Sequence, residues 1–476
     1  MEHKLMKHTP FFQTGIRFAA VLVISACAAG PKTDSGLTIE SSGSIISAEQ
    51  AAARYQIDTQ WWAAYQNAGL NKLIEQALAN NADLKKAAIN MNKALYQAKI
   101  SGADRLPTLD GSLSASTREN LKTGESSRTF SSQAGLSYEI DLWRKLQAQT
   151  NAKVSEYQAT RYALEAARLA LINNVADAYF NIAYLNEAIS LSEQTLKRYQ
   201  EIKRIAAAQY REGKVSSADP RQSEQTLLAT QNNLISLKRA RDTQEQTLRN
   251  LLDLKPNEAI DIAAADYKLS HPINVDMNVP IATLANRPDL RAAEARLQAA
   301  VSQVEAQKRS WYPSVTLGAT LSTASDKART MFNVPFLGGN VSVNLPFLNW
   351  KTLKWQNKAV QAEFDGAAVD FETALTTALN EVNTYYLAYE KARQTSANVQ
   401  QKYELDKKNS RYHQLRYQHG KNSLKDWLEA LNTEYSSAQD VLNQRYEVLR
   451  YENLIFKAMA GRYSKQVADS PNGRRR

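Results

Sequence analysis

Two hydrophobic patterns alternate along the chain, and each occurs twice. In one of them, apolar and small polar residues alternate with a period of two, as in the run from Leu109 to Ala115. A period of two is typical of β-strands. We therefore predict two hairpins, with strands at about residues 106–117, 129–142, 312–323 and 337–347.

Each predicted strand has one apolar and one small polar face. Such strands fit either a half-solvated sheet packed on a core or an outer-membrane barrel with lipid outside and a wet lumen inside. Strand length favours the barrel, because about 11 residues at ~3.3 Å each, tilted by about 45°, span the ~25 Å apolar band. The smallest single-chain barrels use roughly eight strands. A barrel therefore requires this chain to oligomerise.

The second pattern is helical. No Pro or Gly occurs from Arg144 to about Glu212, and apolar residues between Leu171 and Leu185 recur at alternating spacings of four and three. These spacings form a heptad pattern, and together with the absence of Pro and Gly they predict a helix of about 100 Å, which is too long for one globular core. A matching helix is predicted from about Lys351 to Gln418. The many small residues suit helices packed side by side in a cylinder, although the heptads alone also fit a solid coiled-coil rod.

Both patterns belong to one duplicated unit. Asp83-Leu84 recurs as Asp289-Leu290 at an offset of 206 residues, and Gly213-Lys214 recurs as Gly420-Lys421 at an offset of 207. Each half is expected to hold a helix, a hairpin, a long helix and a further helix. The expected divisions are a first repeat at 63–265, a linker at 266–282, a second repeat at 283–462 and a polar tail at 463–476.

The start of the chain has the pattern of a targeting segment. Basic residues up to Arg17 precede the apolar stretch from Phe18 to Ala26, which is too short to cross a bilayer as a helix. This arrangement is typical of a signal peptide. Residues 1–26 are therefore predicted to be a signal peptide.

The only cysteine follows directly. Ile24 to Cys27 resembles the bacterial lipobox, and a polar stretch comes next. We expect lipid on Cys27 and a lipidated tether at residues 27–62, with Ala28 in place of Asp implying passage to the outer membrane. The alternative is a plain cleavage site that contains a cysteine.

Composition excludes several classes of function. The net charge is +11, but the 59 basic residues are scattered among 48 acidic ones, so we expect no nucleic-acid partner and interpret Arg474–Arg476 as a solvated tail. One Cys and five His leave little for a metal site, and no cofactor is expected. No nucleophile elbow, phosphate loop or metal-ligand spacing occurs in the expected mature chain, so we expect no enzyme activity.

Several short motifs occur in a fixed order on this duplicated frame. They are Trp61-Trp62, Asn80 to Leu84, Leu136 to Trp143, Asn286 to Leu290, and Tyr312 to Ser314. Together they resemble the TolC-like outer-membrane efflux protein family, in its lipoprotein branch, from Cys27 to about residue 462. Two departures concern turns: Arg144-Lys145 stands where many relatives have Gly-Arg, and Ala460 to Arg462 replaces a more Gly-rich ending.

The resemblance implies a mainly α fold with a transmembrane β-barrel. Three chains would form a homotrimer with one 12-stranded barrel in the outer membrane and one 12-helix α-barrel in the periplasm. The implied partners are outer-membrane lipid, a periplasmic adaptor and an inner-membrane pump. The implied function is a passive exit duct for small toxic compounds or drugs. A type I protein secretion duct, or a structural envelope lipoprotein with a coiled-coil rod and no pore, remains an alternative.

The resemblance also assigns roles near the turn between the last two helices. Asp426 and Glu429 lie three residues apart on one helix face, where three subunits would stack two rings of carboxylates around a periplasmic aperture; a solvated first turn is the alternative. A closed-state lock maps onto Tyr417 and Asp219. The basic partner in this lock falls on Asn422, so Lys421 or Lys214 would have to supply the charge.

The two Gly-Lys turns, Gly213-Lys214 and Gly420-Lys421, map onto the tips where an adaptor docks. As isolated dipeptides they would be ordinary helix C-caps. Their occurrence at both tips favours docking.

Overall fold

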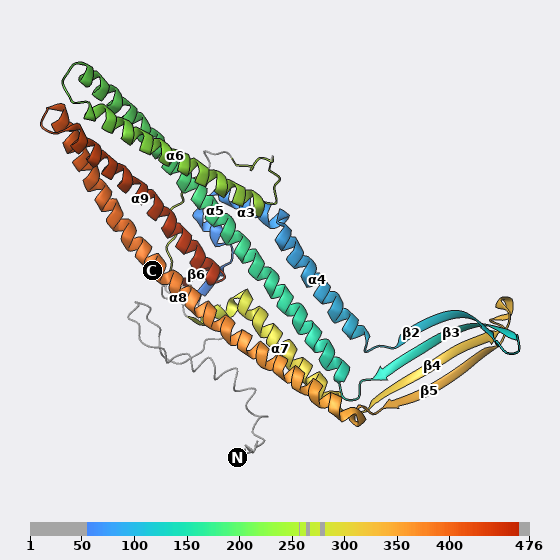
Figure 1. The fold of residues 1–476 in the computed structure, drawn as a ribbon. Coiled ribbons are helices and arrows are strands. Elements are labelled where there is room, and N and C mark those ends of the chain that lie inside the picture. The colour runs from blue at the N-terminus through green and yellow to red at the C-terminus, as the bar shows by residue number, and fades with distance from the viewer. Residues whose placement is uncertain (1–54, 257, 263–266, 277–280, 466–476) are drawn as a thin grey trace, which may run out of the picture.

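The computed structural model describes residues 55–256, 258–262, 267–276 and 281–465. The molecule is elongated: paired long helices form a shaft, and a curved sheet continues it at one end (Figure 1). The signal peptide, Cys27 and most of the predicted tether and tail lie outside the described residues.

Four antiparallel strands form the sheet in the order β2-β3-β4-β5. Their bounds are β2 Thr108–Glu119, β3 Ser126–Ile140, β4 Ser314–Ser325 and β5 Pro335–Asn344. The central pair, β3 and β4, joins the two repeats in a register that sets Phe130 opposite Ser325. Strands β2 and β5 each have one edge that is unpaired within the described chain.

Strands β3 and β5 end earlier than the alternating pattern suggests. After β3, both carboxylate oxygens of Asp141 accept backbone N–H groups, from Leu146 at 3.0 Å and Gln147 at 2.8 Å. This cap starts a helix rather than prolonging the strand. After β5, Pro346 begins the 3₁₀ turn η5, Pro346–Asn349. Proline has no N–H for a strand ladder.

Two very long helices form the shaft. They are α5, Lys145–Arg211, with 67 residues, and α8, Trp350–Gln418, with 69. At ~1.5 Å per residue each is about 100 Å long. The shorter helices pack along them: α3 Ala68–Asn80, α4 Ala82–Ala103, α6 Ala218–Leu251, α7 Pro288–Arg309 and α9 Leu424–Ala458. Within the described ranges, none of these helices has a stretch apolar enough to cross a membrane.

The main core lies around the middle of the shaft. The 3₁₀ turn η1, Trp61–Tyr65, packs its aromatic rings against Tyr179 and Phe180 of α5. Trp61, Tyr179 and Phe180 are fully buried. Close by, β1 (Tyr55–Asp58) pairs with β6 (Arg462–Lys465), which brings the two ends of the described chain together.

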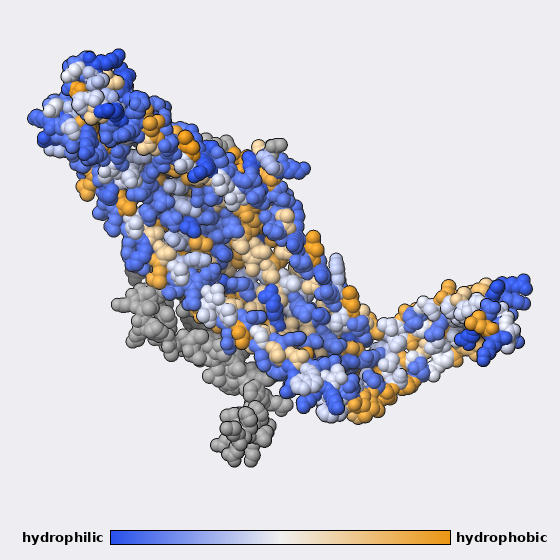
Figure 2. Space-filling model, in the orientation of Figure 1, coloured by the Kyte–Doolittle hydropathy of each residue, from blue (hydrophilic) through white to orange (hydrophobic). Residues whose placement is uncertain are grey.

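The surface of the sheet differs from that of the shaft. Large apolar side chains on the strands are exposed, including Leu109, Leu113, Leu337 and Val341. Figure 2 shows hydrophobic residues along the sheet and at its junction with the helices, whereas the helix tips are mostly hydrophilic. Exposed apolar strands at one end suit a membrane, and polar tips suit water.

Both turns that depart from the pattern of relatives contain a non-glycine residue with positive φ. Arg144 has φ 57°, and Ala460 has φ 58°. Glycine adopts this left-handed region without the steric cost that other residues meet. The Arg144 turn is held by Arg309, whose guanidinium donates to the Arg144 carbonyl oxygen at 2.8 Å.

Candidate functional site

The two helix turns farthest from the sheet form the candidate periplasmic entrance. The α5–α6 and α8–α9 turns lie together at this end (Figure 1). Gly213 and Gly420 have φ 70° and 65° and no neighbour close enough to obstruct a side chain, so backbone conformation rather than space favours glycine. The N–H of Lys214 donates to Gln209 and that of Lys421 to Arg416, at 2.9 and 2.8 Å. Both turns therefore have the geometry of helix C-caps, which was the alternative to adaptor docking in the sequence analysis.

Asp426 has a local structural role at the start of α9. Ser423 is the N-cap, its side chain accepts the Asp426 N–H at 3.1 Å, and the Asp426 carboxylate accepts the Ser423 N–H at 3.0 Å. This reciprocal pair is a capping box. Hydrogen bonds from the Ser423 hydroxyl and backbone lower the pKa of Asp426 from its ordinary value. Asp426 is therefore a half-buried carboxylate that caps α9.

Glu429 lies one turn further along α9. Its side chain is 64% exposed, and its carboxylate is 3.7 Å from the ammonium group of Lys425. An exposed pair at this distance contributes little to stability. At the tip of one subunit, Glu429 is thus exposed to solvent and Asp426 is half-buried.

Tyr417 connects the two tips within one subunit. Its hydroxyl donates to Oε1 of Gln209 on α5 at 2.7 Å, and its ring stacks on Trp427 with centroids 5.2 Å apart. Burial, followed by the negative charge of Asp219, raises the pKa of Tyr417. Asp219 is therefore close enough to act electrostatically, but the hydrogen-bond partner within the subunit is Gln209. The sequence did not identify Gln209, which is 208 residues from Tyr417, or Trp427, which lies on the next helix beyond the turn.

Asn422 accepts a hydrogen bond from Arg416, a cation that the sequence analysis did not consider. Its Oδ1 accepts from Nε of Arg416 at 2.7 Å, and its Nδ2 is 2.7 Å from Nδ1 of His413. Lys214 instead forms an ion pair with Glu212 at 2.7 Å. The cation beside this position is thus Arg416, in the last turn of α8.

A second polar centre ties the middle of the shaft together. Glu452 of α9 is fully buried, and its carboxylate accepts from the Tyr65 hydroxyl at 3.0 Å and from the N–H groups of Ile273 and Asn274 at 3.1 and 2.6 Å. Burial raises the pKa of Glu452, although these hydrogen bonds act in the opposite direction. Three distant chain segments therefore meet at one carboxylate.

The Asn286-to-Leu290 motif also has a structural role. The guanidinium group of Arg287 is buried and donates to Asp289, to Glu381 at 2.7 Å and to the Ala458 carbonyl oxygen at 2.9 Å. It thereby connects α7, α8 and α9. No group of three or more potential metal-ligating side chains occurs in the part of the chain that the structure describes.

Comparisons with known proteins agree with this architecture. The sequence model described as outer membrane efflux protein matches residues 73–253 and 279–461. An uncharacterized protein of Haemophilus influenzae is 39% identical, with 87% of this chain and 92% of that protein covered. Toxin and drug export protein A of Aggregatibacter actinomycetemcomitans is 38% identical, with 87% and 91% covered. The Campylobacter jejuni CmeC outer membrane channel has a TM-score of 0.78 at 26% identity, with 87% and 90% covered.

A duplicated chain with a four-stranded sheet and two long helical hairpins is one third of a trimeric channel, whose barrel crosses the outer membrane and whose helices extend into the periplasm. The chain belongs to the outer membrane efflux protein family. It is the outer-membrane component of a tripartite efflux system and works with a periplasmic adaptor and an inner-membrane pump. The predicted family, fold class, outer-membrane location, trimer, adaptor and pump are confirmed.

Proposed function

We propose that the channel is a passive exit duct for small toxic compounds or drugs and performs no catalytic step of its own. The observation that carries this proposal is the shape of the subunit, a sheet continued by two helices of about 100 Å, which is a wall segment of a wide duct. The name of the 38% identical relative, toxin and drug export protein A, supports this cargo class. Selection among compounds would take place in the pump.

Cargo can be tested in the native bacterium. Deleting the gene should raise the intracellular accumulation of a fluorescent dye such as ethidium, and expression of the wild-type chain should reverse the effect. Deleting the gene of the cognate pump as well should not raise the accumulation of the dye any further. If the deletion strain accumulates the dye at the wild-type rate, small-molecule efflux is the wrong cargo class.

A second candidate is protein secretion, because the name of the same relative joins toxin export with drug export. This alternative predicts that the deletion strain lacks one or more proteins in its culture medium. Comparing the secreted proteins of the two strains separates the two candidates.

We further propose that Cys27 is lipidated and that the divisions at residues 26, 62, 265, 282 and 462 bound the processing and repeat units. Cys27→Ser should abolish labelling of the protein by radioactive palmitate. Trimers should persist, because the barrel and the helices hold the subunits together. Continued labelling of the variant would exclude the lipobox.

We also propose that Asp426 and Glu429 line the periplasmic aperture, that Tyr417 and Asp219 belong to its closed-state lock, and that the tips dock the adaptor through four residues. These are Gly213, Lys214, Gly420 and Lys421. The Tyr417–Gln209 hydrogen bond supports a lock at this position, because it connects α8 to α5 beside Asp219.

The lock predicts that Tyr417→Phe with Asp219→Ala raises the conductance of single channels in planar bilayers. The lost Tyr417–Gln209 hydrogen bond is worth about 1 kcal/mol net, which is roughly fivefold in the population of the open state. Gln209→Ala alone should reproduce the effect of Tyr417→Phe. The control is Tyr412→Phe, because the Tyr412 hydroxyl accepts only from Arg416 on its own helix among the hydrogen bonds described. Wild-type conductance in the double variant would place the lock elsewhere.

A further inference from the structure

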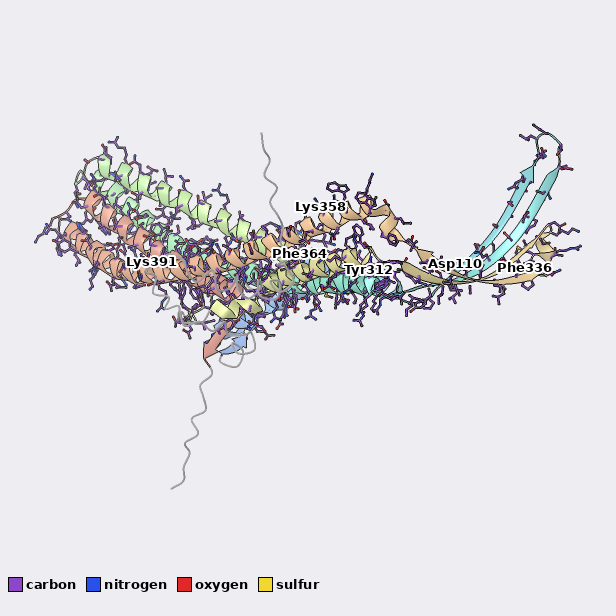
Figure 3. All side chains as sticks on the ribbon, turned by 90° about the horizontal axis from the view of Figure 1, so that it is seen from below. Asp110, Tyr312, Phe336, Lys358, Phe364 and Lys391 are labelled. Atoms are coloured by element: carbon purple, nitrogen blue, oxygen red, sulfur yellow. The ribbon has the colours of Figure 1, made fainter. Side chains whose placement is uncertain are left out.

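The first turns of α8 carry an exposed patch of tryptophan and lysine. Trp350 and Trp355 are 52% and 64% exposed. Lys351, Lys354 and Lys358 are exposed as well, and all five side chains share one helix face because of their three- and four-residue spacings. We name these five residues the Trp–Lys patch. Figure 3 shows Lys358 at the end of α8 nearest the sheet, with Lys391 farther along the shaft.

The three lysines have no acidic partner in the described part of the chain. The 28 residues from Pro335 to Ala362 include no Asp or Glu. The contacts recorded for the ammonium groups are instead with aromatic rings: Lys351 with Trp350 at 5.8 Å, and Lys354 and Lys358 with Trp355 at 5.8 and 5.2 Å. A positive charge near a helix N-terminus opposes the helix dipole, so α8 itself does not favour these lysines there.

The first repeat provides an internal comparison. At the corresponding start of α5, Asp141 caps the helix and Lys145 forms an ion pair with Glu139 at 2.7 Å. Trp143, the counterpart of Trp350, donates to the Pro313 carbonyl oxygen at 2.8 Å and stacks on Tyr312. Among the described residues, no carboxylate accepts the first N–H groups of α8, and no carbonyl oxygen accepts from the Trp350 ring, although neither helix has a side-chain cap from its own N-cap residue. The second repeat thus leaves charge and aromatic surface available for a partner.

We propose that the Trp–Lys patch binds the anionic headgroups of phospholipids in the periplasmic leaflet of the outer membrane. The patch follows the last membrane strand after five residues, and the exposed apolar side chains of Val341, Val343 and Leu345 lead toward it. Tryptophan is favoured at the level of headgroups, and lysine pairs with their phosphates. Lipid on this patch fixes the depth of the trimer in the membrane.

The test uses the full-length trimer in mixed micelles titrated with phosphatidylglycerol or phosphatidylcholine, with bound lipid counted by native mass spectrometry. The wild type should bind phosphatidylglycerol at least about tenfold more tightly, and high salt should reduce the preference. Lys351→Gln, Lys354→Gln and Lys358→Gln together should remove it, and Lys354→Gln alone should weaken it. The matched control neutralises Lys391, Lys402 and Lys407 on the same helix and should keep the preference.

Four results would overturn the proposal. One is an unchanged lipid preference in the triple variant. Equal affinity for soluble glycerol phosphate would indicate a site for free anions instead. Loss of the trimer in both the triple and the single variant would identify the patch as a subunit interface. Altered ion selectivity with unchanged lipid binding would place the lysines in the lumen.

Discussion

Glu452→Ala is expected to open the segment at residues 267–276 from the shaft. The substitution leaves the Tyr65 hydroxyl and the N–H groups of Ile273 and Asn274 without their acceptor. Each unsatisfied buried donor costs about 1–3 kcal/mol. A total near the lower end, about 3 kcal/mol, corresponds to roughly a 100-fold increase in local opening.

Limited proteolysis of the trimer measures this opening, because cleavage follows the population of the open form when closing is fast. Cleavage at the 267–276 segment should accelerate about 100-fold, with far-ultraviolet circular dichroism unchanged. Glu447→Ala is the control, since Glu447 lies on the same helix and forms only a partly exposed pair with Arg450. Equal cleavage rates in the wild type and the Glu452 variant would show that other contacts hold the segment.

The pKa of Glu452 gives the same prediction a pH dependence. Burial raises this pKa above 4.5, so the folded protein binds the proton more tightly than the unfolded chain does. Its contribution to stability is present below pH 4.5 and is lost as pH rises toward the folded pKa. Protection of the segment should therefore decline over that window in the wild type. Glu452→Gln should remove this dependence, with the charge of Arg462 left in place.

Regular elements could be predicted from the sequence because their signals are local. The period-two runs predicted four strands within a few residues of β2 to β5. Two long segments without Pro, the first without Gly and the second with only Gly366, predicted helices close to α5 and α8. The ends were harder to predict, because single side chains decide them. Asp141 stops β3 by capping α5, and this cap competes with an otherwise continuous alternation.

The polar centres could not be predicted from the sequence, because the fold brings their distant residues together. Tyr65 and Glu452 are separated by 387 residues, and Tyr417 and Gln209 by 208. No sequence pattern relates residues so far apart, and a single Glu within a predicted helix is normally interpreted as a surface residue. The two glycine turns could be predicted from the duplication. Both have a positive φ, which favours glycine, so the same residue occurs at both tips. The duplication could not identify Arg416 beside Asn422, because the equivalent turn of the first repeat pairs Lys214 with Glu212.

Neutralising the entrance acids is expected to reduce the cation selectivity of the channel. Three subunits would bring six carboxylates from Asp426 and Glu429 to one narrow opening, where like charges attract cations and repel anions. Two unit charges about 4 Å apart in water interact by ~1 kcal/mol, so removing the rings should change the cation-to-anion permeability ratio at least about fivefold. Block by multivalent cations should disappear with them.

The capping box determines how this experiment is designed. Asp426→Ala would remove the charge and also the acceptor of the Ser423 N–H, which costs about 1 kcal/mol of helix stability. Asp426→Asn with Glu429→Gln removes both charges, and the Asn side-chain oxygen can still accept that N–H. Reversal potentials of single channels in a salt gradient give the permeability ratio. Glu390→Gln with Glu404→Gln, two exposed acids on α8 away from the tip, is the control. If the Asn/Gln variant keeps the wild-type ratio, Asp426 serves only as a cap and the selectivity of the entrance comes from other residues.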